Sequence, residues 1–139
     1  MTDPDSEREY DQMRLVPSGV SGTRLRVGYD RDRGPSASAI ARFVVQLEYL
    51  PESDDPADES NWQAVVRSDH GPGAGEHDVS EEGVHLDVYR SGTKIGADQL
   101  TGPTSPTDGF DRAEEHIREH AKDYVKRYQR WLKTDRKDD

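Results

Sequence analysis

The chain alternates apolar and polar side chains along much of its length, which is the two-residue period of β-strands. Four segments show this period: residues 24–29, 40–50, 62–69 and 83–90. The strongest is IARFVVQLEYL at 40–50, where Phe43, Val45 and Leu47 share one side of the strand. A tight-turn signal at Ser91-Gly92 predicts that residues 93–100 return as a further strand. Segments rich in glycine, proline and acidic residues separate most of the strands and are typical of loops.

After residue 108 the apolar side chains recur every three or four residues, which predicts a helix over residues 108–133. Its apolar stripe consists of Phe110, Ala113, Ile117, Ala121, Tyr124, Tyr128 and Trp131, widened by Val125 and Leu132. Asp108 is the expected N-cap of this helix. An amphipathic helix needs an apolar surface to cover, and a sheet provides one. The sequence therefore predicts an α+β fold: a small antiparallel sheet of three to five strands with one long C-terminal helix packed on one face.

The length of 139 residues corresponds to one domain. The hydrophobic fraction is only 30% and the charged fraction is 35%, so the chain can fold only if its apolar residues are concentrated. We expect a single domain over residues 21–133. A flexible, disordered N-terminal tail is expected at 1–20 and a flexible C-terminal tail at 134–139.

The net charge of −10 indicates the kind of environment in which the protein works. Abundant carboxylates, few aliphatic side chains and no cysteine together indicate adaptation to high salt, which screens self-repulsion. The lack of cysteine excludes disulfides and thiolate metal sites. No apolar run approaches the roughly 18 residues of a membrane span, and the acidic first residues are unlike a signal peptide. We therefore expect a cytoplasmic protein without membrane contact.

Strand parity predicts a polar face on the sheet as well as an apolar one. Residues 62–69 are expected to place Trp62, Ala64 and Val66 on one face. Arg67 and Asp69 are expected on the other. If the apolar faces of neighbouring strands meet the helix, their polar faces coincide on the far side.

The next predicted strand, 83–90, adds His85, Asp87 and Tyr89 to that polar face, and the long loop before it carries further histidines. His85 would act as a general base, oriented by Asp69 or Asp87. Arg67 would hold an anionic group such as phosphate. These residue types suit metal-independent cleavage of RNA, whereas the alternative is an ordinary solvent-facing strand surface. The candidate site residues are Arg67, Asp69, His70, His77, His85 and Asp87.

A metal centre is a second interpretation of the same region. Nitrogen and oxygen ligands for zinc or manganese would come from His70, His77, His85, Asp69, Asp78 and Asp87, although their spacing matches no closed motif. We predict no cofactor. The glycine-rich run GPGAG at 71–75 lacks a following GK[ST] and is interpreted as a flexible connection and not as a phosphate-binding loop.

The predicted helix carries two further patterns. Residues 116–120, HIREH, match the H-x-x-E-H pattern of inverted zinc peptidases, but only 19 residues follow. We interpret these two histidines as bordering the apolar stripe, with His120 beside the stripe and His116 further out. Basic and aromatic residues alternate late in the helix, which would suit contact with RNA phosphates. A solvated helix face is the favoured interpretation.

Two resemblances rest on R-x-D-H at residues 67–70 and GVHLDVYR at 83–90. The span 42–132 resembles a family of small haloarchaeal proteins of unknown function. More distantly, the order of strands, the R-x-D-H strand end, the histidine-bearing loop and the final helix are similar to TumE-type toxins of toxin–antitoxin pairs. That resemblance implies a small α+β toxin encoded beside a helix-turn-helix antitoxin.

Three functions are therefore compared. The first is a toxin-like domain acting on RNA, with an antitoxin-like protein or RNA as its partner. The second is a non-enzymatic domain that binds another protein through its sheet or helix. The third is an acidic mimic of nucleic acid, in which many scattered carboxylates and no single residue would matter.

Overall fold

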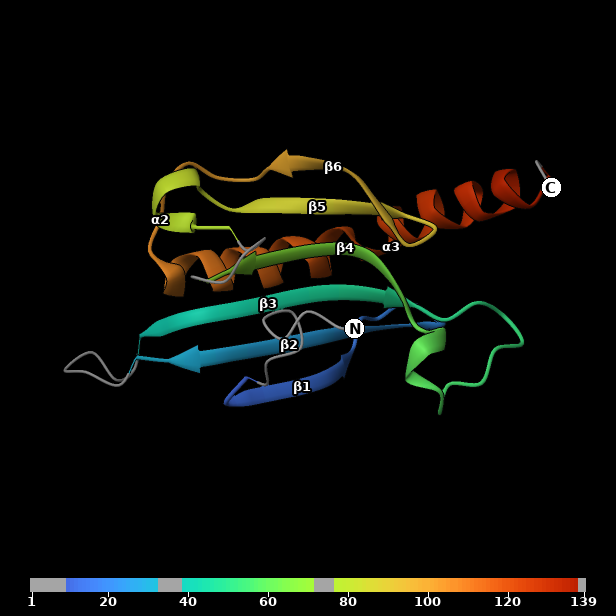
Figure 1. Cartoon of the computed structure of the whole chain (residues 1–139), viewed down its shortest axis with the longest axis horizontal. Coiled ribbons are helices and arrows are strands. Elements are labelled where there is room, and N and C mark those ends of the chain that lie inside the picture. Colours follow the sequence, from blue (N-terminus) through green and yellow to red (C-terminus); the bar gives the residue numbers. More distant parts are fainter. Residues whose placement is uncertain (1–9, 33–38, 72–76, 138–139) are drawn as a thin grey trace.

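The computed structural model describes residues 10–32, 39–71 and 77–137, and these residues form an antiparallel sheet backed by one long helix (Figure 1). The strands are β1 (Gln12–Pro17), β2 (Thr23–Arg31), β3 (Ile40–Tyr49), β4 (Gln63–His70), β5 (His85–Arg90) and β6 (Thr93–Gln99). The helices are η1 (Glu59–Asn61), α2 (Val79–Glu82) and α3 (Pro106–Lys137). Each strand pairs with the next one in the chain, so the order in the sheet is the order in the sequence.

The α+β fold with a C-terminal helix is confirmed, but the prediction of three to five strands is wrong, because the described residues contain six. The additional strand is β1, which lies inside the segment expected as a flexible tail. It pairs with β2 from Gln12↔Tyr29 to Pro17↔Arg24. Backbone hydrogen bonds hold this edge strand while most of its side chains stay exposed, so its apolar pattern is weak.

Helix α3 begins earlier and ends later than predicted. The hydroxyl of Ser105 accepts the backbone N–H of Asp108 at 3.1 Å, so Ser105 and not Asp108 serves as the cap, and Pro106 occupies the first helical position. At the other end, four residues assigned to the tail are helical. Arg90 donates to Asp135 at 2.8 Å, which ties this last turn to the end of β5.

The core lies between α3 and one face of the sheet (Figure 1). The sheet contributes Leu25, Val27, Phe43, Val45, Leu47, Val66, Leu86 and Val88. The helix contributes the buried side chains Phe110, Ala113, Ile117, Ala121, Val125 and Tyr128, while Tyr124, Trp131 and Leu132 pack at the margin. The predicted stripe is therefore confirmed. We call the face of the sheet turned away from α3 the open face.

A β-bulge changes the predicted side-chain directions at the start of β4. Leu47 pairs with Val66, but Glu48 pairs with Ala64, so one residue is skipped. Ala64 therefore lies on the open face, and Trp62 stacks there beneath the guanidinium of Arg24, 4.0 Å from its ring centroid. The prediction that Trp62 and Ala64 share a face with Val66 is wrong, because a register shift of one residue reverses side-chain direction.

The open face carries charged side chains that are largely buried in ion pairs. Glu48, which is 4% exposed, accepts hydrogen bonds from Arg24 at 2.7 Å and Arg26 at 3.0 Å. Both arginines also contact Glu59 of η1. In the described parts of the chain, no helix is long and apolar enough to cross a membrane.

Candidate functional site

Strands β4 and β5 pair over only a short stretch, and a polar cluster forms where they separate. The pair Arg67↔Asp87 is the last in this direction along β4. Beyond it lies His77, which precedes α2. Its backbone N–H donates to Oδ1 of Asp69 at 3.0 Å, and its Nε2 lies 3.1 Å from Oδ1 of Asp87. His77 therefore bridges the carboxylates of the two strands.

Both bridged carboxylates are buried and have cationic partners. The side chain of Asp69 is 4% exposed and accepts from Nε of Arg67 at 2.8 Å. The side chain of Asp87 is 5% exposed, and Nζ of Lys94 on β6 lies 3.1 Å from its Oδ1. Arg67, Asp69 and Asp87 thus lie together on the open face, as strand parity predicts.

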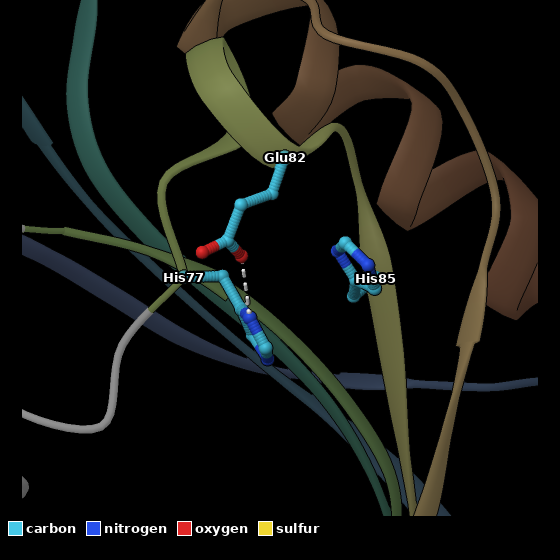
Figure 2. A group of neighbouring side chains, drawn as sticks. All are labelled: His77, Glu82 and His85. Atoms are coloured by element: carbon cyan, nitrogen blue, oxygen red, sulfur yellow. Dashed lines mark hydrogen bonds and ion pairs between the residues drawn. The ribbon is translucent and has the colours of Figure 1, made fainter.

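Figure 2 shows His77, Glu82 and His85 converging from successive parts of the stretch 77–85. Glu82 ends α2, and its Oε2 lies 3.1 Å from Nδ1 of His77. His85 begins β5, and its ring stacks on that of His77 with centroids 5.1 Å apart. Nδ1 of His85 faces the carbonyl oxygen of Gly83 at 3.3 Å, and a carbonyl only accepts, so this nitrogen carries the proton. In the neutral ring, Nε2 of His85 then holds the lone pair, and among the described residues it has no hydrogen-bond partner.

The surroundings of His77 favour its charged form. Burial lowers the pKa of His77, but the hydrogen bonds to Glu82 and Asp87 and the charges of Asp87 and Asp69 outweigh burial, and the pKa lies above its ordinary value. The cluster then holds the cations Arg67, Lys94 and His77 against the carboxylates Asp69, Glu82 and Asp87. Its charges balance locally within a chain of net charge −10.

His70 does not join this cluster, contrary to the prediction. It lies on the helix side of β4, is 9% exposed and stacks on Phe43 with centroids 6.0 Å apart. Its Nδ1 accepts the backbone N–H of Val79, the first residue of α2, at 3.0 Å. Successive side chains of a strand point to opposite faces of the sheet, so His70 points away from its neighbour Asp69. His70 therefore supports the start of α2.

Asp78 has a role that differs from that of the predicted metal ligand, whereas Tyr89 lies on the face where parity places it. Asp78 is the N-cap of α2 and accepts from the backbone N–H and the hydroxyl of Ser80 at 3.0 and 2.7 Å. Tyr89 lies on the open face opposite Lys94. Burial raises the pKa of Tyr89, against the opposing charge of Arg67, so its hydroxyl stays protonated near neutral pH.

The histidines of α3 form a separate pair at the margin of the core. The rings of His116 and His120 lie 4.4 Å apart, and Nε2 of His116 is 2.7 Å from the hydroxyl of Tyr124. His116 is half-buried and His120 is exposed, the reverse of the expected order. The glycine-rich run at 71–75 lies outside the described residues except for Gly71.

The residues that could hold a metal ion differ from the predicted set. Among the described residues, His77, Glu82 and His85 each offer one ligand atom, and these atoms lie within 4.8 Å of one another. His70 and Asp78 are engaged at the start of α2. Asp69 and Asp87 orient neighbouring groups. The cluster therefore combines two imidazoles and a carboxylate, which suits either proton transfer or metal binding.

Sequence reasoning missed Glu82 and Lys94, although each had a signal. The stretch DVSEEG has an N-cap Asp78, acidic residues in the first turn and a glycine at the end, which is the pattern of a short helix. The Ser91-Gly92 turn has positive φ at both residues, which is typical of a two-residue hairpin. That turn sets the register that places Lys94 opposite Tyr89.

The comparisons with known proteins identify a family and no activity. The chain matches no curated protein and no solved structure. Residues 7–134 match the family described as a domain of unknown function, DUF7718. This match covers nearly the whole sequence and confirms the prediction of an uncharacterised family. The chain belongs to the DUF7718 family.

Proposed function

We propose that this chain is a toxin-like domain that cleaves RNA by proton transfer at the cluster between β4 and β5. The observation that carries the proposal is the stacked pair His77 and His85, whose ring centroids lie 5.1 Å apart. In this pair His77 would donate a proton and His85 would accept one. Both ring nitrogens of His77 face carboxylates, so both carry protons. His85 keeps a lone pair on Nε2. A general acid and a general base are thus side by side.

RNA suits such a pair because it supplies its own nucleophile. Nε2 of His85 takes the proton of a ribose 2′-hydroxyl while that oxygen bonds to the adjacent phosphorus. The bond from phosphorus to the 5′-oxygen breaks, and this oxygen takes a proton from Nδ1 of His77 once Glu82 swings away. The products are a 2′,3′-cyclic phosphate and a 5′-hydroxyl. Asp87 keeps the ring of His77 oriented through Nε2.

The cationic group for the phosphate is Lys94 in this proposal, and not Arg67. The side chain of Lys94 is 48% exposed, whereas that of Arg67 is 23% exposed and held by Asp69 and Gln46. Arg67 therefore serves as a positioning residue for Asp69, which in turn holds the backbone of His77. Because one exposed lysine neutralises one phosphate, the affinity for RNA should depend only weakly on salt, with a slope of about −0.7 in a plot of log affinity against log salt.

The test uses a short RNA and an identical RNA with one 2′-deoxyribose at the cleaved position. We expect the metal-free protein to cleave the first RNA only, with a 2′,3′-cyclic phosphate product, and EDTA should cause no loss of this cleavage. His85→Gln and His77→Gln should each lower the rate about 10²–10⁴-fold. His120→Gln, which changes an exposed histidine on α3, should leave the rate unchanged. Absence of cleavage by the parent protein, or full activity of His85→Gln, would refute the proposal.

A protein-binding function is the second candidate, and the edge strands favour it. Leu15 on β1 is 48% exposed and Ile95 on β6 is 51% exposed. Both strands are at the ends of the sheet, where an extended segment of a partner can add by backbone hydrogen bonding. An antitoxin-like protein would use such an edge. Growth arrest on expression that His85→Gln abolishes favours the toxin, whereas partner binding without any growth effect favours the interaction domain.

A further inference from the structure

We infer that His77, Glu82 and His85 form a binding site for one divalent transition-metal ion of the zinc type. Their ligand atoms lie within 4.8 Å of one another and come from one continuous stretch, 77–85, which folds back on itself through α2 before β5 begins (Figure 2). Zinc binds imidazole nitrogen and carboxylate oxygen at about 2.0–2.2 Å, which sets tetrahedral ligand atoms roughly 3.4 Å apart. Binding of the ion therefore requires rotation of these side chains to bring the three ligand atoms closer together.

The second ring nitrogen of each histidine is already held by an acceptor. Nε2 of His77 contacts Asp87 at 3.1 Å, and Nδ1 of His85 contacts the carbonyl of Gly83 at 3.3 Å. Metal-bound histidines almost always donate their other N–H to a carboxylate or a carbonyl, which fixes the tautomer and the ring orientation. Nδ1 of His77 and Nε2 of His85 are therefore the atoms that would bind the ion.

Glu82 already shares Nδ1 of His77, with a proton between them. An ion at this position replaces that proton and binds both groups, so the cluster gains one positive charge in a chain of net charge −10. Three protein ligands leave a fourth position for water or another ligand, as in zinc sites with an open position.

The metal site rests on these contacts alone and does not depend on the proposed cleavage of RNA. It does have a consequence for that reaction. The ion occupies the same Nε2 of His85 and Nδ1 of His77 that would exchange protons with the ribose and the leaving oxygen. Bound Zn²⁺ therefore inhibits cleavage, and EDTA restores it.

The test is calorimetric titration of the full chain with Zn²⁺ after treatment with EDTA and desalting. We expect one ion per chain, with the dissociation constant raised at least about tenfold in Glu82→Gln and in His85→Gln. Glu81→Gln is the matched control, because Glu81 is the exposed neighbour of Glu82 in α2. Far-ultraviolet circular dichroism verifies that each variant is folded, and Co²⁺ absorption reports the ligand geometry.

Two results would overturn the inference: no stoichiometric binding to the folded parent protein, or equal loss of affinity in Glu81→Gln and Glu82→Gln, which indicates diffuse attraction to carboxylates. Failure of the proposed function gives a different result. Zn²⁺ then binds with the expected dependence on Glu82 and His85, while the metal-free protein leaves RNA intact.

Discussion

Replacement of Gly83 by alanine should destabilise the protein by about 2–6 kcal/mol. Gly83 joins α2 to β5 with φ 80° and ψ 179°, a region that side-chain-bearing residues avoid at a cost of about 1–3 kcal/mol. A Cβ atom there would lie 2.1 Å from the carbonyl oxygen of Thr101 and 2.8 Å from Gly102, both backbone atoms. Relief of such overpacking by backbone movement costs about another 1–3 kcal/mol.

Gly92→Ala is the matched control for this change. Gly92 also has positive φ, at 85°, but a Cβ there would meet no atom within 4 Å. It therefore carries the conformational cost of about 1–2 kcal/mol without the clash. Equilibrium urea unfolding of both variants measures the difference, with the slope of each transition compared to that of the parent. A Gly83→Ala variant as stable as Gly92→Ala would refute the packing of the 101–102 backbone against the start of β5.

Three further predictions concern charge. Glu48→Ala should lower the free energy of unfolding by up to about 3–5 kcal/mol, because it removes a buried carboxylate and leaves Arg24 and Arg26 with only the exposed Glu59 as partner. Glu59→Ala, at a side chain that is 60% exposed, should cost about 0–1 kcal/mol. Urea unfolding compares the two variants, and equal losses would contradict the burial of Glu48. Burial and the nearby charge of His120 lower the pKa of His116, so the unfolded chain takes up a proton below about pH 6.5 that the folded chain resists. Thermal melts should show the stability of the parent falling relative to His116→Gln as the pH drops through this range, and parallel curves would contradict this. Raising NaCl from about 0.1 to 1 M, which shortens the screening length from roughly 10 to 3 Å, should raise the melting temperature because the net charge is −10, and a flat or falling temperature would exclude adaptation to high salt.

Periodicity predicted the central part of the fold because burial controls it. Strands β2 to β5 and α3 each turn a continuous apolar side towards the core, so the period of two or of about 3.6 residues is visible in the sequence. Strand β1 was not predicted, because backbone hydrogen bonds hold it to β2 while Met13 and Leu15 remain exposed. An edge strand therefore leaves little trace in an apolar pattern.

Part of the site was also predicted from a periodic pattern, the alternation of side chains along the strands. Parity places Arg67, Asp69 and Asp87 on one face, and the register confirms that they meet there. Sequence reasoning assigns His70 to the loop after residue 69, but β4 continues to His70, so strand parity applies to it and places it on the opposite face from Asp69. The position of His77 depends on where β4 and β5 separate, which is a tertiary feature and not a periodic one.

The separation of β4 and β5 explains why a protein with few apolar side chains keeps buried charges here. If the register Arg67↔Asp87 continued, Asp69 would lie opposite His85 and diagonal to Asp87, so two carboxylates would be near neighbours on adjacent strands. The inserted His77 donates its backbone N–H to one carboxylate and its ring to the other, so it replaces the missing strand pairing with charge-assisted hydrogen bonds. Those two hydrogen bonds use only the backbone N–H and Nε2 of His77, while Arg67 and Lys94 supply positive charge to the same carboxylates. Nδ1 of His77 is directed instead at the exposed Glu82, beside His85, and this is the arrangement that a purely structural bridge would not need.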